Sequence, residues 1–249
     1  MGSTIMKISI VTITRNDGKL LQRNLDSLYS QQLEKGDEIE HIIVNAQDGS
    51  PVTAPQSKVF TYPADGIYNA INRGLSHTTG DVIGVVHGND FLADKCVLNR
   101  VSDTFRKYTP DFVYGDVEFV SDAHPGVVYR HYGAADFKPG HLLAGFAPPH
   151  PSLFISRHTL EKVGNYKTDY RIAGDFEYFV RLFCKYDLTS RYIPHVAVRM
   201  EKGGESASFF SRSVTGTREK YRALRENGLK VSMLRIVCRI FFYIRHKKL

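Results

Sequence analysis

Cysteine is scarce in this sequence, and the few cysteines lie far apart. The 249 residues include three of them, Cys96, Cys184 and Cys238, with no Cys-x-x-Cys spacing. A disulfide framework in a small secreted domain is rich in cysteine, and a structural zinc site needs closely paired ligands, so the sequence favours neither. We therefore expect a protein of a reducing compartment such as the cytoplasm.

Long apolar runs are also missing. No run approaches the roughly 20 residues that a membrane-spanning helix needs, and the first four residues lack the charged and apolar regions of a signal peptide. We therefore expect a chain that is neither exported nor integral to the membrane. Apolar residues still make up 42% of the sequence, which is ample for a core and excludes general disorder.

Excess positive charge is absent from most of the chain, although the net charge is +7. Residues 218–249 hold ten Lys or Arg and two Glu, which leaves 23 basic against 24 acidic residues before them. Proteins that bind nucleic acids usually carry a basic face on the folded domain itself. The distribution predicts no nucleic-acid partner and a basic C-terminal tail.

Strand-like and helix-like segments alternate in the first 108 residues. We expect strands at 7–14, 38–45, 58–61 and 81–87 and helices at 16–32, 65–77 and 94–108. This alternation predicts an α/β fold, with a mostly parallel twisted sheet and helices on its faces.

The pattern loosens after residue 108. We expect a strand at 111–120 paired in a hairpin with 127–132, a strand at 149–156, a helix at 171–186 and a helical C-terminus. The chain shows no internal repeat and no low-complexity linker. We therefore divide it into one domain at residues 1–208 and a helical extension at residues 209–249.

Polar residues follow the expected strands at their carboxyl ends, where open α/β sheets bind ligands. Asn16, Asn45 and the segment His87-Gly88-Asn89-Asp90 occupy such positions. Gly88 permits close approach of a bulky ligand, and Asp90 offers a hard oxygen for Mg²⁺ or Mn²⁺. The alternative for Asp90 is an ordinary turn or helix-capping residue.

Six motifs extend over residues 6 to 208. They are "VTITRN", "IIVNAQDGS", "ADGIYNAINRGLSHTTGDVIGVVHGND", "PPHPSLF", "IAGDFEYFVRL" and "EKGGES". In order and spacing they resemble family 2 glycosyltransferases with the GT-A fold, above all bacterial enzymes of exopolysaccharide and O-antigen synthesis of the colanic-acid type. The resemblance implies a GT-A (Rossmann-like) sheet and an inverting hexosyl- or N-acetylhexosaminyltransferase. Its partners would be a nucleotide-sugar donor and a glycan or lipid-linked glycan acceptor.

The resemblance also implies roles for individual residues. Asp175 matches the catalytic base, and Asp90 matches the ligand of Mn²⁺ or Mg²⁺ in a reduced acidic motif. Asn45 stands where the family usually has an Asp that bonds the nucleotide base, and the nearby Asp48 is a candidate substitute. The other donor-binding matches are Thr12, Thr14, Asn16, Asp65, Asn89, His150, Gly203, Gly204 and Ser206.

The chemistry explains why a carboxylate would be needed at position 175. An acceptor hydroxyl is a poor nucleophile at neutral pH, so a base must take its proton as the new bond forms. Asp175 lies in the first turn of the expected helix, whose N-terminus favours the ionised form. The alternative is a plain helix-opening acid, and Glu177 and Arg181 on the same helix are spaced to form a structural ion pair.

The C-terminal segment 229–244 has the spacing of a basic amphipathic helix. Its apolar face would contain Met233, Ile236, Val237, Ile240, Phe241 and Ile244. Such a helix suits an anionic membrane surface, and we expect a cytoplasmic protein with peripheral contact to the inner face of the membrane. The alternative is a helix that packs on the catalytic domain or on a second copy in a homo-oligomer.

Two other functions are compatible with the same fold. A sugar-phosphate nucleotidyltransferase would carry a Gly-rich basic loop after the first strand, and "TRNDGKLL" is a poor version of one. A binding protein without catalysis is supported by the reduced "HGND" motif and by Asn45. The phosphate-loop and dinucleotide-binding glycine patterns are absent, which removes two competing nucleotide-binding folds.

Overall fold

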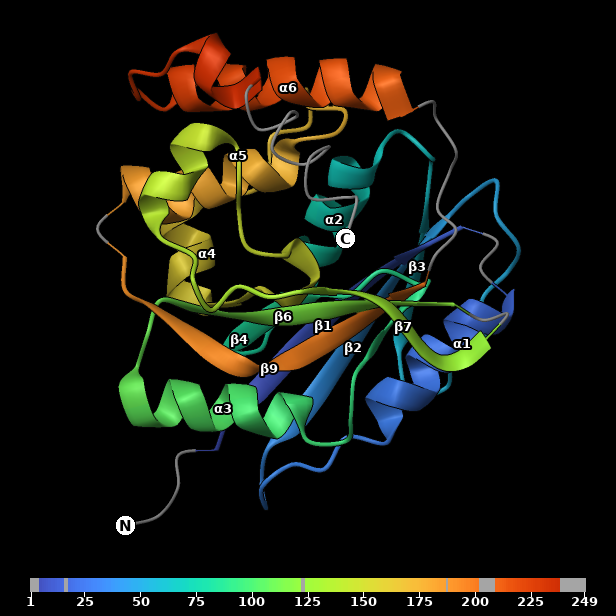
Figure 1. Cartoon of the computed structure of the whole chain (residues 1–249). Coiled ribbons are helices and arrows are strands. Elements are labelled where there is room, and N and C mark those ends of the chain that lie inside the picture. Colours follow the sequence, from blue (N-terminus) through green and yellow to red (C-terminus); the bar gives the residue numbers. More distant parts are fainter. Residues whose placement is uncertain (1–4, 16–17, 122–123, 187, 202–208, 238–249) are drawn as a thin grey trace.

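A nine-stranded sheet forms the centre of the computed structural model (Figure 1). The structure describes residues 5–15, 18–121, 124–186, 188–201 and 209–237. The strands are β1 (Lys7–Thr14), β2 (Glu38–Ala46), β3 (Lys58–Tyr62), β4 (Val82–Val85), β5 (Asp90–Leu92), β6 (Phe112–Ser121), β7 (His124–Tyr132), β8 (Phe154–Ser156) and β9 (Ser190–Glu201).

The strand order is β3-β2-β1-β4-β8-β6-β9-β5, with β7 paired to β6. The first four strands in this order, β3, β2, β1 and β4, run parallel to one another, and β6 is parallel to β9. The strands β8, β5 and β7 are antiparallel to their partners. The predicted α/β sheet with a parallel core, and the hairpin of β6 and β7, are confirmed.

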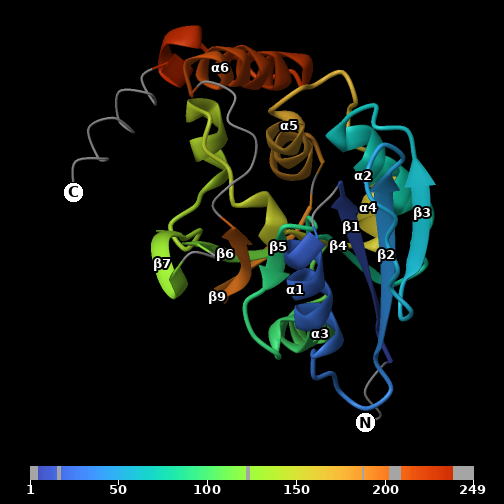
Figure 2. The same cartoon turned by 90° about the vertical axis from the view of Figure 1, so that its right-hand side faces the viewer.

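Helices cover both faces of this sheet (Figure 1). On one side α3 packs over the strands, and on the other side α5 lies between the sheet and α6, as Figure 2 also shows. The helices are α1 (Gly18–Tyr29), α2 (Ile67–Ser76), α3 (Val97–Tyr108), α4 (Arg157–Val163), α5 (Gly174–Val180) and α6 (Phe209–Glu226).

The core has a layer on each face of the sheet because successive side chains of a strand point to opposite faces. On β1, Ile8 and Ile10 belong to the same buried cluster as Phe105 of α3, whereas Val11 belongs to the cluster that contains Ile71 of α2. This two-sided burial explains the continuous apolar run of β1.

Two expected elements are shorter than the sequence indicated. The strand expected at 149–156 is reduced to β8, because residues His150–Ser152 form the 3-10 turn η2 between Pro149 and the strand. Proline has no N–H to give to a strand ladder. The helix expected at 171–186 begins at Gly174, since its apolar stripe begins only at Phe176, and it continues as the π-helical segment η3 (Arg181–Lys185).

The expected helix 229–244 is also wrong at its start. The helix α6 ends near Gly228, whose φ of 81° is in the left-handed region, and a second short helix begins only at residue 233. Ile236, expected on the membrane face, is fully buried in the core. Residues 238–249 lie outside the described part, and the domain division at residue 208 stays a prediction.

Candidate active site

The predicted ligand-binding edge of the sheet is assembled from the ends of β1, β2 and β4. Thr14 at the end of β1 lies beside Asn45 at the end of β2 in the parallel register. The backbone N–H of Gly88, just after β4, donates to the carbonyl of Ile13 at 3.0 Å. The structure therefore brings Thr14, Asn45 and the segment 87–90 to one edge.

The turn 87–90 is held from two sides. Its closing hydrogen bond runs from the Asp90 N–H to the His87 carbonyl at 2.9 Å. From α1, Asn24 Nδ2 donates to the same carbonyl at 3.1 Å and to the Asp90 carbonyl at 2.8 Å. Asp90 itself opens β5 and pairs with Met200 of β9, and it is 1% exposed. The alternative of a helix cap for Asp90 is wrong, because a strand follows it.

The sequence motifs did not point to Asn24 as a site residue, although its position on the helix could have done so. Leu21, Leu25 and Leu28 define the buried face of α1, and Asn24 lies on that face. A polar side chain within an apolar helical stripe indicates a buried hydrogen-bonding role. Asn24 is 2% exposed and uses its amide to fix the turn that carries Asp90.

Asp175 lies at the first turn of α5, half-buried. Burial raises the pKa of this carboxyl, while the charge of Lys220 and a hydrogen bond from the Phe176 N–H at 2.7 Å lower it. We expected the helix N-terminus to favour the ionised form, but burial, which favours the neutral form, is the larger effect. A carboxylate with a raised pKa is a stronger base once ionised.

His150 brings a third segment to the same place. Its Nε2 lies 2.8 Å from the Tyr166 hydroxyl, and its ring centre lies 6.4 Å from that of His87. His87 in turn is close enough that a proton on its ring would lower the pKa of Asp175. Burial lowers the pKa of His150 to about 4, so the ring is neutral near pH 7. The turn after β4, η2 and the start of α5 thus converge.

Other predicted residues lie elsewhere or face other partners. The Thr12 hydroxyl points into the interior and meets His41 Nε2 at 2.9 Å, so its side chain serves the packing of β1. Asp48 is exposed and pairs with Arg15 at 2.6 Å. Asp65 does not cap α2, whose N-cap is Gly66. Instead it forms a two-bond ion pair with Arg73, at 2.9 and 2.6 Å.

Asn45 is 3% exposed and its amide donates to the Ser50 carbonyl at 2.9 Å. Within the described part of the chain, Asn45 Oδ1 accepts no hydrogen bond. Asn89 is half-buried in the turn before Asp90. The remaining predicted donor-binding residues, Asn16, Gly203, Gly204 and Ser206, lie outside the described residues.

The predicted pair of Glu177 and Arg181 is confirmed as structural. Arg181 Nε donates to Glu177 Oε2 at 2.9 Å, and Glu177 is fully buried. The other guanidinium nitrogens of Arg181 donate to the carbonyls of Val163 and Asn165. These contacts tie α5 to the chain around α4 and leave Asp175 as the half-buried acid of the helix.

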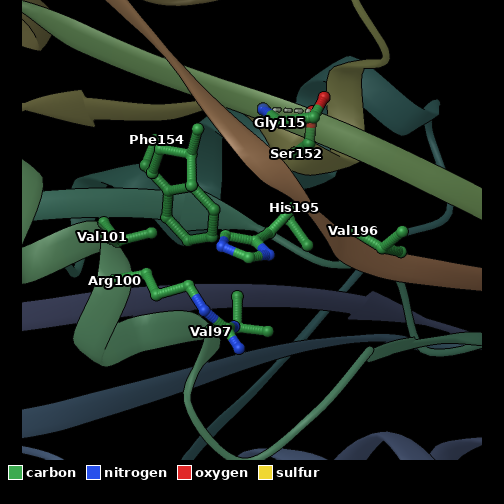
Figure 3. A pocket seen from close by; sticks show the side chains of 10 residues that line it. Val97, Arg100, Val101, Gly115, Ser152, Phe154, His195 and Val196 are labelled. Atoms are coloured by element: carbon green, nitrogen blue, oxygen red, sulfur yellow. Dashed lines mark hydrogen bonds between the residues drawn. The ribbon is translucent and has the colours of Figure 1, made fainter. Parts of the chain in front are cut away.

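Another pocket lies on the α3 side of the sheet, and Figure 3 shows the residues that line it. Its walls are mainly apolar side chains of α3 and β9, with Phe154 of β8. Arg100 reaches this pocket, but two hydrogen bonds hold its guanidinium to Asp94. The pocket contains His195 but no carboxylate among its lining residues, so it offers no carboxylate base comparable to Asp175.

Residues 9–159 match the family model described as Glycosyl transferase family 2. The chain belongs to this family. A glycosyltransferase of Mycobacterium tuberculosis, named as uncharacterised, is 32% identical over 70% of this chain and 68% of its own length. A PGL/p-HBAD biosynthesis glycosyltransferase of Mycobacterium bovis is 28% identical over 76% and 74% of the two chains.

The fold of this glycosyltransferase matches solved structures at low sequence identity. TarS of S. aureus (residues 1–349) has a TM-score of 0.67 at 14% identity, over 97% of this chain and 73% of that chain. A mannosyltransferase from Pyrobaculum calidifontis, solved with GDP-Man and Mn²⁺, has a TM-score of 0.59 at 16% identity, over 90% and 64%. These likenesses confirm the GT-A architecture expected from the motifs.

The sequence left open whether the protein transfers a sugar or a nucleotide. Membership of this family favours sugar transfer. Among the helices that the structure describes, none is long and apolar enough to cross a membrane.

Proposed function

We propose that this glycosyltransferase inverts the anomeric configuration of its donor sugar and uses Asp175 as the base. The observation that carries the proposal is the position of Asp175, a half-buried carboxylate beside His87 with a pKa raised by burial. Asp175 takes the acceptor hydroxyl proton as that oxygen bonds to the anomeric carbon and the bond to the nucleoside diphosphate breaks. A single displacement inverts the configuration.

The donor nucleotide is proposed to lie at the edge formed by Thr14 and Asn45. The buried Oδ1 of Asn45, which accepts no hydrogen bond within the described part of the chain, suits an N–H donor of a nucleotide base. Asn89 and Asp90 are the residues proposed to face the diphosphate. Asn16, Gly203, Gly204 and Ser206 belong to this proposal through the resemblance alone.

The residues present fit a divalent cation that keeps most of its ligands from outside the protein. Among the described residues, no group of three or more His, Cys, Asp or Glu is arranged to hold a metal. Asp90 offers one carboxylate, and the backbone of Asp90 is held by Asn24 and by pairing with β9. Mg²⁺ and Mn²⁺ are commonly held by one or two carboxylates plus phosphate oxygens. When bound, the cation would neutralise charge on the departing diphosphate.

A nucleotide-activated hexose or N-acetylhexosamine is the proposed donor. The neighbour TarS was solved with UDP-GlcNAc and the mannosyltransferase with GDP-Man, which supports this donor class. A glycan or lipid-linked glycan is the proposed acceptor. The name of the M. bovis relative refers to PGL/p-HBAD biosynthesis, which supports a biosynthetic role. The motif resemblance to exopolysaccharide enzymes supports a glycan product.

The experiment compares Asp175→Asn with wild type on UDP-GlcNAc, GDP-mannose, UDP-glucose, UDP-galactose and dTDP-rhamnose, with products detected by mass spectrometry. Loss of a general base is expected to lower kcat by about 10²- to 10⁴-fold. Calorimetric binding of UDP or GDP with Mn²⁺ should remain, whereas Asp90→Asn should weaken the Mn²⁺-dependent part. NMR of the product should show the anomeric configuration opposite to that of the donor.

Asp26→Asn is the matched control, because Asp26 is exposed on α1 and its carboxylate accepts a hydrogen bond from Gln22 of the same helix. It should leave kcat unchanged. Full activity of Asp175→Asn would refute the base assignment. Nucleotide binding without transfer in wild type, on every donor, would favour the binding-protein alternative.

A further inference from the structure

Five consecutive backbone N–H groups lead into the proposed base, and all five are bound by side chains from two other helices. The N–H groups of Arg171, Ile172 and Ala173 donate to the carboxylate of Glu219 in α6, at 2.8, 2.9 and 2.8 Å. Those of Gly174 and Asp175 donate to the hydroxyl of Tyr68 in α2, at 2.8 and 3.3 Å.

The Tyr68 hydroxyl is fixed in this position by a third contact and by packing. It donates its own proton to the Ile172 carbonyl at 3.0 Å, and its side chain is 6% exposed. Burial raises the pKa of the phenol, so it remains a neutral donor and acceptor near pH 7. One hydroxyl therefore joins the backbone on both sides of Ala173.

Glycine at position 174 makes this approach possible. A Cβ added to Gly174 would lie 2.6 Å from Cζ of Tyr68, closer than carbon atoms approach in folded proteins. The aromatic ring is buried and stacked with the ring of Tyr166, so it has little room to withdraw. The small residue before Asp175 thus lets the ring lie against the start of α5.

The helix α6 is well anchored on the segment that it binds. Besides Glu219, Arg222 pairs with Asp169 at 2.9 Å and Asn227 Nδ2 donates to Glu177 Oε1 at 3.1 Å. Lys220, which follows Glu219 in α6, donates to the Gly145 carbonyl at 2.7 Å. Its charge lowers the pKa of Asp175. Figure 2 shows α6 stacked above α5, with α2 beside α5.

We infer that Tyr68 and Glu219 are positioning residues that hold the backbone of Asp175 in its reactive place, so the C-terminal helix α6 completes the active site. The inference rests on the proposed role of Asp175 as base. A base must stay within hydrogen-bond reach of the hydroxyl that it deprotonates. Neither positioning residue needs to touch a substrate for this purpose, because each acts on the chain that carries the carboxylate.

The test uses Tyr68→Phe, Glu219→Gln and Glu219→Ala, assayed with the donor that the panel of sugar nucleotides identifies. Misplacement of a catalytic group by about 1 Å can cost on the order of a hundredfold in rate. We expect kcat to fall by about tenfold or more in Tyr68→Phe and Glu219→Ala, with the donor KM unchanged. Glu219→Gln should recover part of the activity, since its amide oxygen still accepts a hydrogen bond.

Two matched controls separate positioning from loss of stability. Tyr29→Phe removes a phenol that bonds to Ser57 on the opposite face of the sheet, and Glu161→Gln changes an exposed residue of α4. Both should retain kcat. Melting temperatures should show that Tyr68→Phe and Glu219→Gln remain folded at the assay temperature.

A double variant distinguishes this inference from the proposed function. If Tyr68 acts through Asp175, then Tyr68→Phe should have no further effect on kcat in an Asp175→Asn background. Loss of activity in Asp175→Asn with normal kcat in Tyr68→Phe and Glu219→Ala would overturn the positioning role alone. Normal activity in Asp175→Asn would overturn the proposed function instead.

Discussion

Asn24 shows at the level of a single residue how the packing of a helix fixes the chemistry of the site. Its amide nitrogen joins the carbonyls of His87 and Asp90, two residues of a turn more than 60 positions away in the sequence. A buried carbonyl that loses its donor costs about 1–3 kcal/mol, whereas the His87 carbonyl would keep the hydrogen bond from the Asp90 N–H. The conformation of the turn therefore depends on a side chain that contacts neither sugar nor nucleotide in the proposed mechanism.

We predict that Asn24→Leu lowers the free energy of unfolding by about 1–3 kcal/mol. It should also weaken the Mn²⁺-dependent binding of UDP or GDP, because the turn that carries Asp90 loses its support. Urea denaturation and calorimetry measure the two effects. Gln22→Leu changes an exposed amide on the same helix and is the matched control. Equal results for the two variants would show that Asn24 does not hold the turn.

The sequence predicted Asp90, Asp175 and His150 because the motifs that contain them resemble a known family. It did not predict Tyr68 or Glu219 as partners of Asp175. Tyr68 lies more than 100 residues before the backbone that it binds, and Glu219 more than 40 residues after it. Such contacts are set by how α2 and α6 dock on α5, and local periodicity carries no information about docking.

At the level of elements, periodicity predicted the segments whose burial is local and missed those defined by pairing. The strands and helices through residue 108 followed their expected ranges, apart from β5, which was unexpected. β5 has only three residues and exists by pairing with β9. β9 itself contains Pro194, which argues against a central strand. The register between β6 and β9 shifts near this point, after Tyr114, and so accommodates the proline.

The C-terminal segment illustrates two competing uses of one apolar face. Leu229 and Val231 pack against the core and Ile236 is fully buried, whereas Leu234 is 69% exposed. The described part of the segment therefore packs on the catalytic domain, as the alternative interpretation of the sequence had it. Contact with a membrane remains a proposal for the basic end of the chain, which lies outside the described residues, and it rests on charge.

We predict that replacing Arg245, Lys247 and Lys248 by Gln weakens binding to vesicles that contain anionic lipid. Each basic residue near such a surface contributes about 1 kcal/mol, so the loss should be on the order of a hundredfold. Vesicle sedimentation measures it. The control replaces three exposed lysines elsewhere, Lys35, Lys95 and Lys162, by Gln. An equal effect of both triple variants, or no binding by wild type, would refute the proposal.

For the whole molecule, buried ionisable groups link stability to pH. His41 is 3% exposed, and burial lowers its pKa to about 3; burial lowers that of His150 to about 4. In the unfolded chain both imidazoles take up protons below about pH 6.5. Glu40 acts in a lower range: burial raises its pKa, but hydrogen bonds from Ser9, Lys58 and Thr79 outweigh burial and bring it to about 2. Asp175, with its raised pKa, opposes this trend under acid conditions.

We predict that the free energy of unfolding falls as the pH is lowered from 7 to 5. Over this range His41 and His150 bind protons in the unfolded chain but stay neutral in the folded chain. Each histidine therefore lowers the free energy of unfolding by up to about 1.4 kcal/mol per pH unit. Urea denaturation at several pH values measures the slope. His41→Gln should reduce this slope by the contribution of one bound proton. His158→Gln, at an exposed position of α4, should leave the slope unchanged. A stability that stays constant between pH 7 and 5 would mean that the two buried imidazoles become protonated without unfolding, and the neutral state of His150 in the active site would then be wrong as well.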